Sequence, residues 1–107
     1  MATVLSQAIE DAYPRPAAYV LRPVGGTYLY KGSCRDLSER LKDHRAGRVR
    51  HTKNKRPLEL VYVEYVADYA AARTLEMYLK TGTGRDFLKA FLAGKVARVA
   101  EWQTQQT

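Results

Sequence analysis

Tyr19-Val20-Leu21 and Tyr30-Lys31-Gly32-Ser33 are two short stretches with strand-forming residues, and the pair Gly25-Gly26 lies between them. Tyrosine and β-branched residues favour strands, whereas glycine can take the positive φ values that tight turns need. The arrangement predicts strands over Ala17 to Arg22 and Thr27 to Lys31, joined as a hairpin. The two tyrosine motifs would then stand on adjacent strands.

The segment after this hairpin has the pattern of a capped helix. Asp36 can accept a hydrogen bond at the helix start, with Glu39 three residues later, as in a capping box. Leu37 and Leu41 are four residues apart and predict the buried side of the helix. Ala46-Gly47 predicts its end.

Further along, the chain predicts one more strand and two more helices. Leu58 to Val66 is rich in strand formers. Asp68 can cap a helix that runs through Lys80, where residues 81–84, two threonines alternating with two glycines, would break it. Arg85 to Ala93 predicts the last helix.

Composition restricts the class of protein. With 107 residues, 12.1 kDa and 46% hydrophobic residues, the chain is expected to be one domain with a single core. Cys34 is the only cysteine, which excludes an intramolecular disulfide and argues against a cysteine-built zinc site. The first residues lack the pattern of a signal peptide, and no stretch approaches the roughly 20 apolar residues that cross a bilayer. We therefore expect a cytoplasmic protein that does not enter a membrane.

The positive charge is concentrated in one part of the chain. Lys31 to Pro57 holds ten basic and three acidic side chains, so this stretch accounts for the whole formal net charge of +7. Such a stretch suits a polyanion such as DNA, because phosphates attract Lys and Arg and release counterions when they are neutralised. A solvated basic face that only aids solubility is the alternative.

The order of the motifs matches a known family. The two tyrosine motifs are followed by the stretch Arg35 to His44, and further on by Glu76 with Lys80 one helical turn after it. In this order the residues resemble the GIY-YIG endonuclease family, which includes the N-terminal nuclease domain of the bacterial excinuclease C subunit and small stand-alone members. The likeness runs from about Ala17 to Leu92.

The resemblance implies a fold as well as an activity. Ala17-Ala18-Tyr19 stands where the family usually has Gly-Ile-Tyr, and Tyr30-Lys31-Gly32 where it has Tyr-Ile-Gly, so both tyrosines and the glycine are kept. The implied fold is a compact α/β (α+β) domain with a three-stranded, mainly antiparallel sheet flanked by helices. We expect residues 1–16 to be an N-terminal lead-in with at most a short helix, 17–93 the nuclease-like domain, and 94–107 a helical or frayed tail.

Two residues suit the electrostatics of phosphodiester hydrolysis, in which negative charge gathers on the phosphate oxygens. Arg40 is always protonated and can donate two parallel hydrogen bonds to a phosphate. Glu76 suits a hard divalent cation, Mg²⁺ or Mn²⁺, which needs only one or two carboxylates besides waters and substrate. Because no partner carboxylate is nearby in the sequence, a single-metal site is expected.

The group that activates water is left open between two tyrosines. Tyr19 or Tyr30 could position or deprotonate it if a cation assists, since phenols have a pKa of about 10. His44, one helical turn after Arg40, could shuttle a proton or donate to the phosphate. Excinuclease-type members carry a lysine just after the glycine of the second motif, where this chain has Ser33.

The remaining predicted contacts are to the DNA backbone. Gly32 and Ser33 would lie close to the phosphate, and the polar stretch from residue 48 to 56 is expected to be a mobile loop that grips the backbone. Its candidate DNA-binding residues are Arg48, Arg50, His51, Lys53, Lys55 and Arg56.

The sequence thus predicts a metal-dependent DNA endonuclease with a single metal ion and tyrosine-assisted attack by water. One alternative is a non-catalytic nucleic-acid-binding module that uses the same basic surface. Another is a nuclease subunit that cleaves only in a complex, where a protein partner or a second copy provides specificity. The sequence alone indicates neither the DNA structure cleaved nor the pathway.

Overall fold

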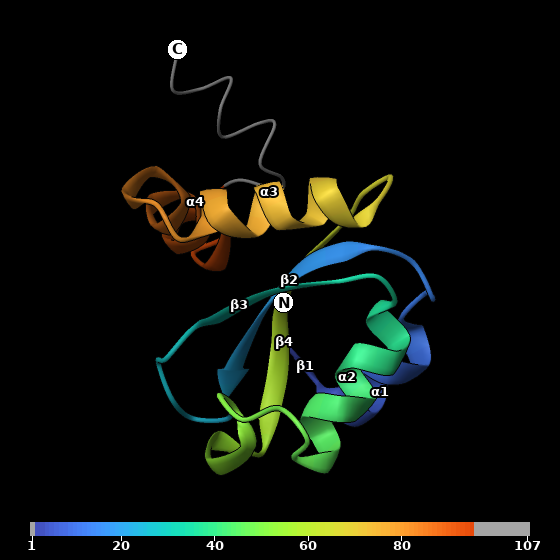
Figure 1. The fold of residues 1–107 in the computed structure, drawn as a ribbon. Helices are drawn as coiled ribbons and strands as arrows, with labels where there is room; N and C mark the ends of the chain where they lie inside the picture. The colour runs from blue at the N-terminus through green and yellow to red at the C-terminus, as the bar shows by residue number, and fades with distance from the viewer. Residues whose placement is uncertain (1, 96–107) are drawn as a thin grey trace. The chain divides into compact units, whose positions relative to one another are not determined.

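A computed structural model describes residues 2–95 of the chain. By contacts, the chain forms two compact units, Met1–Glu76 and Met77–Thr107. The first contains the sheet, and the elements run in the order shown in Figure 1. They are β1 (Thr3–Val4), α1 (Leu5–Asp11), β2 (Ala17–Pro23), β3 (Tyr30–Cys34), α2 (Leu37–Ala46), the 3₁₀ turn η1 (Lys53–Lys55), β4 (Leu58–Tyr65), α3 (Tyr69–Leu79) and α4 (Gly82–Leu92).

The sheet has four strands in the order β1-β4-β2-β3, and all neighbouring strands are antiparallel. The expected antiparallel α+β architecture is therefore confirmed, but the predicted count of three strands is wrong. The additional strand is β1, in which Thr3 pairs with Leu60 and Val4 with Glu59. A two-residue strand is too short to show a period of two, so pairing with β4, rather than local sequence, defines it.

The tyrosine hairpin forms with a longer loop than predicted. Its second strand begins at Tyr30, three residues after the expected start at Thr27, and Gly25 takes a φ of 80° in the connection. In the register of β2 and β3, Tyr19 lies directly opposite Gly32. Directly opposed residues of an antiparallel pair project to the same face, so the side chain of Tyr19 extends toward Gly32.

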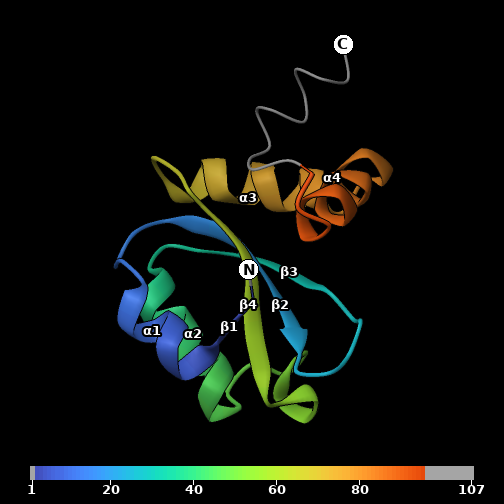
Figure 2. The same ribbon diagram turned by 180° about the vertical axis from the view of Figure 1, so that it is seen from behind.

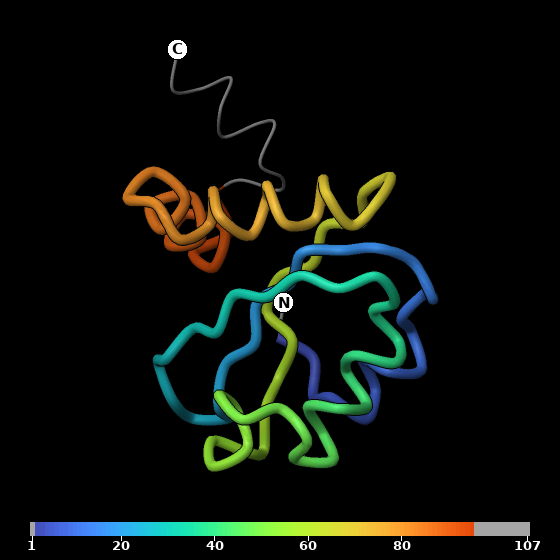
Figure 3. Tube along the Cα trace, viewed as in Figure 1, coloured from blue at the N-terminus to red at the C-terminus, as the bar shows by residue number. Residues whose placement is uncertain are grey.

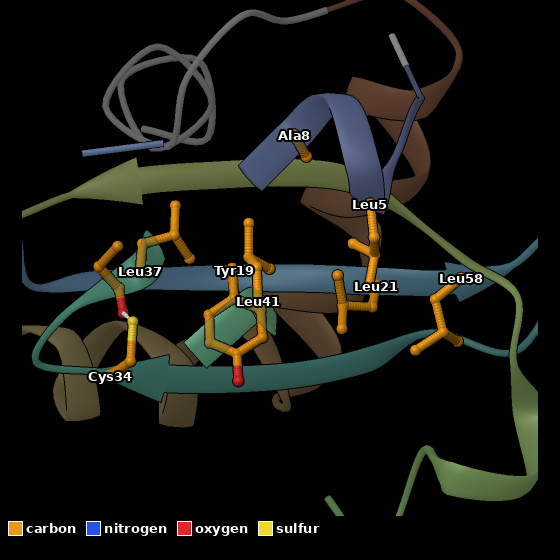
Figure 4. Packing of buried hydrophobic residues seen from close by; sticks show 9 residues of the cluster. Leu5, Ala8, Tyr19, Leu21, Cys34, Leu37, Leu41 and Leu58 are labelled. Atoms are coloured by element: carbon orange, nitrogen blue, oxygen red, sulfur yellow. Dashed lines mark hydrogen bonds between the residues drawn. The ribbon is translucent and has the colours of Figure 1, made fainter. Parts of the chain in front are cut away.

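One face of the sheet packs against α1 and α2 (Figures 1 and 2). Figure 4 shows the core between them, in which Tyr19 of β2 lies among Leu37 and Leu41 of α2. Leu5 and Ala8 of α1 belong to the same cluster, so residues of the predicted lead-in contribute to the core. Burial of such side chains typically contributes about 1.5–3 kcal/mol each.

The ends of α2 agree with the predicted caps. Asp36 Oδ1 accepts a hydrogen bond from the backbone N–H of Glu39 at 3.0 Å. Gly47 ends the helix with a φ of 80°, and its N–H donates to the carbonyl oxygens of Asp43 and His44. The Leu37 and Leu41 face is buried as expected, and His44 is buried with it.

The helices that follow the sheet were predicted with one error. Asp68 caps α3, accepting from the backbone N–H of Ala71 at 2.8 Å, as expected. Residues 81–84 do not simply break the chain. Thr81 caps α4 by accepting from the N–H of Gly84 at 3.0 Å, so α4 begins at Gly82, three residues earlier than predicted. Threonine is a good N-cap, which outweighs the low helix propensity of glycine here.

Two connections lie at the same end of the sheet. Figure 3 shows the β2–β3 loop beside the segment that joins α2 to β4. The ammonium group of Lys55 lies 4.9 Å from the ring centre of Tyr28 and so links the two.

None of the helices within residues 2–95 is both long and apolar enough to cross a membrane.

Candidate active site

Tyr19 and His44 form the buried centre of the site. Both side chains are fully buried, and the Tyr19 hydroxyl is hydrogen-bonded to His44 Nε2 at 2.8 Å. Burial, followed by the proximity of Tyr30, raises the pKa of Tyr19 above its ordinary value of 10. Tyr19 therefore keeps its proton near neutral pH, and His44 is the hydrogen-bond partner of that hydroxyl.

Gly32 makes room for this arrangement. A Cβ atom at position 32 would lie 2.6 Å from both Cζ and the hydroxyl oxygen of Tyr19, and 3.0 Å from Cε2 of Tyr30. The rings of Tyr19 and Tyr30 therefore lie so close to Gly32 that no side chain larger than hydrogen fits at this position. The glycine of the second tyrosine motif thus permits the first tyrosine to reach His44.

His44 is held through its second ring nitrogen as well. Nδ1 is hydrogen-bonded to Thr52 Oγ1 at 2.7 Å, and Thr52 is itself fully buried. Burial, and then the nearby charge of Arg40, lowers the pKa of His44 to about 4. The imidazole is therefore neutral at pH 7. Thr52 was not predicted as part of the site, because a threonine within a basic polar stretch gives no sign that it is buried.

Arg40 and Tyr30 form the more accessible side of the site. The guanidinium of Arg40 lies close to the hydroxyl groups of Tyr19 and Tyr30. It remains partly exposed and lies 3.8 Å from an Asp43 carboxylate oxygen. The ring of Tyr30 contacts His44 edge-on at 5.3 Å between ring centres. The structure thus brings together four of the predicted site residues, from β2, β3 and α2.

Glu76 approaches β3 from α3. Its Oε1 accepts a hydrogen bond from Ser33 Oγ at 2.5 Å and pairs with Arg73 at 3.4 Å, and the residue is only 6% exposed. Arg73 was not singled out in the sequence. No group of three or more His, Cys, Asp and Glu side chains in residues 2–95 could enclose a metal. The oxygens of Glu76 and Ser33 nevertheless fit a hard cation that keeps most of its waters, as Mg²⁺ does.

The basic stretch between α2 and β4, residues 48–56, contains more regular structure than a plain loop. Val49 and Thr52 are buried and η1 forms within it. Arg56 donates to the backbone carbonyl oxygens of Lys53 at 2.9 Å and Arg45 at 3.2 Å, and thereby fastens the stretch to the end of α2.

The predicted DNA-binding residues of this stretch differ in their surroundings. Arg48 pairs with Asp43 at 2.9 Å. Arg50 and Lys53 are exposed. His51 is also exposed and stacks on Tyr30, with 6.4 Å between ring centres and an interplanar angle of 26°. This stacking brings the basic stretch against the accessible side of the site.

This small antiparallel α+β domain carries a guanidinium, two phenols, an imidazole and a buried carboxylate. These are the groups expected of a nuclease-type catalytic domain. The family model described as GIY-YIG catalytic domain matches residues 16–89, and the chain belongs to this family. Nucleases of the family generally use divalent metal ions and act on nucleic acids.

One curated relative is similar over part of its length. A UPF0213 protein from Bacillus pumilus (strain SAFR-032) is 39% identical over 66 residues, which cover 61% of this chain and 66% of the relative. The chain therefore spans slightly less than two thirds of that protein. No solved structure matches the chain.

Proposed function

We propose that this protein is a metal-dependent endonuclease that hydrolyses DNA phosphodiester bonds. The observation that carries the proposal is the position of Arg40, whose guanidinium lies close to the phenols of both motif tyrosines while remaining partly exposed. A cation at this position can meet a phosphate and a water-activating group together. A fully solvated helix arginine would have no reason to lie beside both tyrosines.

Arg40 would bind the scissile phosphate. Negative charge grows on the phosphate oxygens as water attacks, and a preorganised donor stabilises that charge more than it stabilises the ground state. The planar guanidinium can donate to two oxygens of one phosphate. Asp43, 3.8 Å away, helps to fix its orientation.

Tyr30 would position or deprotonate the attacking water, and Tyr19 would support the groups around it. Tyr19 is fully buried and bonded to His44, so water does not reach it directly. Tyr30 is only partly buried, lies beside Arg40 and leads toward His51 at the surface. His44, with both ring nitrogens engaged, would hold the Tyr19 proton rather than contact the phosphate.

Glu76 would hold one Mg²⁺ or Mn²⁺, with Ser33 beside it. When bound, the ion would supply positive charge opposite the developing negative charge of the phosphate and leaving oxygens. Arg73, which pairs with Glu76, would balance the carboxylate when no ion is bound. Gly32 and Ser33 bring the backbone of β3 next to this position.

The basic stretch would supply affinity for the DNA backbone. Arg50, His51, Lys53 and Lys55 are exposed and carry the predicted phosphate contacts. These contacts are independent of base sequence, so a protein partner or a second copy would provide specificity.

The test is nicking of supercoiled plasmid by the purified protein with Mg²⁺ and with chelator. We expect nicking only with the metal, and at least about 100-fold less nicking by Glu76→Gln. Glu10→Gln, which changes an exposed carboxylate on α1, is the matched control and should nick normally. If the protein binds the plasmid but never nicks it in the presence of Mg²⁺, the protein is a non-catalytic binding module instead.

A further inference from the structure

Thr52 has a buried polar side chain within the basic stretch, residues 48–56. It is fully buried although its neighbours His51 and Lys53 are exposed. Its backbone N–H donates to the carbonyl oxygen of Val49 at 3.2 Å, which fixes the turn. A buried hydroxyl is unfavourable unless it is hydrogen-bonded. Its bond to His44 Nδ1 at 2.7 Å therefore explains why a threonine occupies this position.

The proton positions follow from the two hydroxyl groups that hold His44. The hydroxyls of Tyr19 and Thr52 can each donate or accept, but the phenol is the more acidic and so the better donor. The Tyr19 hydroxyl is buried, and it donates to His44 Nε2 at 2.8 Å. Since Nε2 accepts, a neutral imidazole carries its proton on Nδ1. That N–H then donates to Thr52 Oγ1.

We propose that Thr52 is a positioning residue that holds His44 in the Nδ1–H tautomer and so keeps Nε2 available to the Tyr19 proton. The inference rests on the proposed function for its effect on cleavage, but the tautomer itself does not depend on any activity. In the opposite tautomer Nε2–H would point at the Tyr19 hydroxyl. The phenol proton would then lose its acceptor, and the ordered chain from Tyr19 through His44 to Thr52 would be broken.

Three variants isolate the hydroxyl of Thr52. Thr52→Val keeps the shape but removes the acceptor, whereas Thr52→Ser keeps the acceptor. Thr74→Val makes the same replacement at an exposed position of α3 and serves as the control. For each protein, long-range ¹H–¹⁵N NMR of the imidazole at pH 7 reports the tautomer of His44. Single-turnover cleavage and DNA affinity are measured on the same samples.

We expect the Nδ1–H tautomer in the wild type, Thr52→Ser and Thr74→Val, and a loss of that preference in Thr52→Val. Cleavage by Thr52→Val should fall about 10- to 100-fold, as is typical when a residue that orients an imidazole is removed. Its DNA affinity should stay within about twofold of the wild type.

Several results would overturn the proposal. They are Nε2–H in the wild type, an unchanged tautomer in Thr52→Val, or full cleavage by that variant. If Thr52→Val does not fold, the wild-type tautomer and Thr52→Ala decide the question. A wild type that never cleaves would instead refute the proposed nuclease function, while the NMR result would still decide the tautomer.

Discussion

Replacing Gly32 with alanine should separate the geometry of the site from its ability to bind DNA. The added methyl group would lie 2.6 Å from Cζ and the hydroxyl oxygen of Tyr19, about 0.8 Å inside an ordinary contact of roughly 3.4 Å. Tyr19 is fully buried, so its ring cannot move without disturbing the core. The 2.8 Å bond to His44 should be lost when the ring shifts.

The expected loss of stability can be worked from this clash. Overpacking of a well-packed core costs about 1–3 kcal/mol. The lower entropy of the unfolded alanine chain offsets about 0.4–1 kcal/mol of that. The net destabilisation therefore lies between about 0 and 2.6 kcal/mol, and its midpoint of about 1.3 kcal/mol corresponds to roughly 5–10 °C in Tm for a domain of this size. Cleavage should fall by at least about 100-fold, whereas DNA affinity should change little because the basic stretch is not altered.

Thermal melting, plasmid nicking and DNA binding of Gly32→Ala would be compared with those of Gly82→Ala. At Gly82 an added methyl group meets nothing within 4 Å, so the same change should leave melting and nicking unchanged or raise Tm slightly. If Gly32→Ala melts and cleaves like the wild type, Gly32 is not required to make room for Tyr19, and the explanation by packing is wrong.

Three further predictions concern charge. Arg40→Lys keeps the positive charge but loses the planar guanidinium, so single-turnover cleavage should fall about 100- to 1000-fold while DNA affinity stays nearly unchanged. Equal cleavage rates would show that Arg40 does not act in the reaction. Burial lowers the pKa of His44 from 6.5 to about 4. Between these two pH values His44 is protonated in the unfolded chain but neutral in the folded chain, so the folded state loses stability as the pH falls. Stability in urea should thus drop by about 2 kcal/mol from pH 7 to pH 5, and by less in His44→Gln. Replacing Arg50 and Lys53 with Gln should lower the log-log salt dependence of DNA binding by about one unit per lost contact, and an unchanged slope would place the DNA elsewhere.

The tyrosine hairpin and the helix after it could be predicted because their signals are local. Gly25 marks the turn, Asp36 marks the helix start and Gly47 its end, and each effect acts within a few residues. The order of motifs then identified the family, which the match over residues 16–89 confirms. Tyr19, Tyr30, Arg40 and His44 were expected to act together, and the structure places them in one cluster.

The features that escaped prediction depend on contacts between distant parts of the chain. The edge strand β1 exists because Thr3 finds Leu60, 57 positions further along the chain. Thr52 is buried because the basic stretch folds back on His44, which no local pattern indicates. The pairing of Ser33 with Glu76 likewise joins residues 43 positions apart. The assignment of catalytic and DNA-binding roles to individual residues stays a prediction.

The end position of β3 in the sheet has a consequence for the behaviour of the protein at high concentration. A terminal strand presents backbone groups to which a strand of another molecule can add, which is a common start of aggregation. β3 contains five residues, and Lys31 carries a charge within it. A short strand with an internal lysine is a poor template for such addition. The departure of this chain from the usual isoleucine of the motif therefore disfavours the addition of a strand from another molecule at this edge of the sheet.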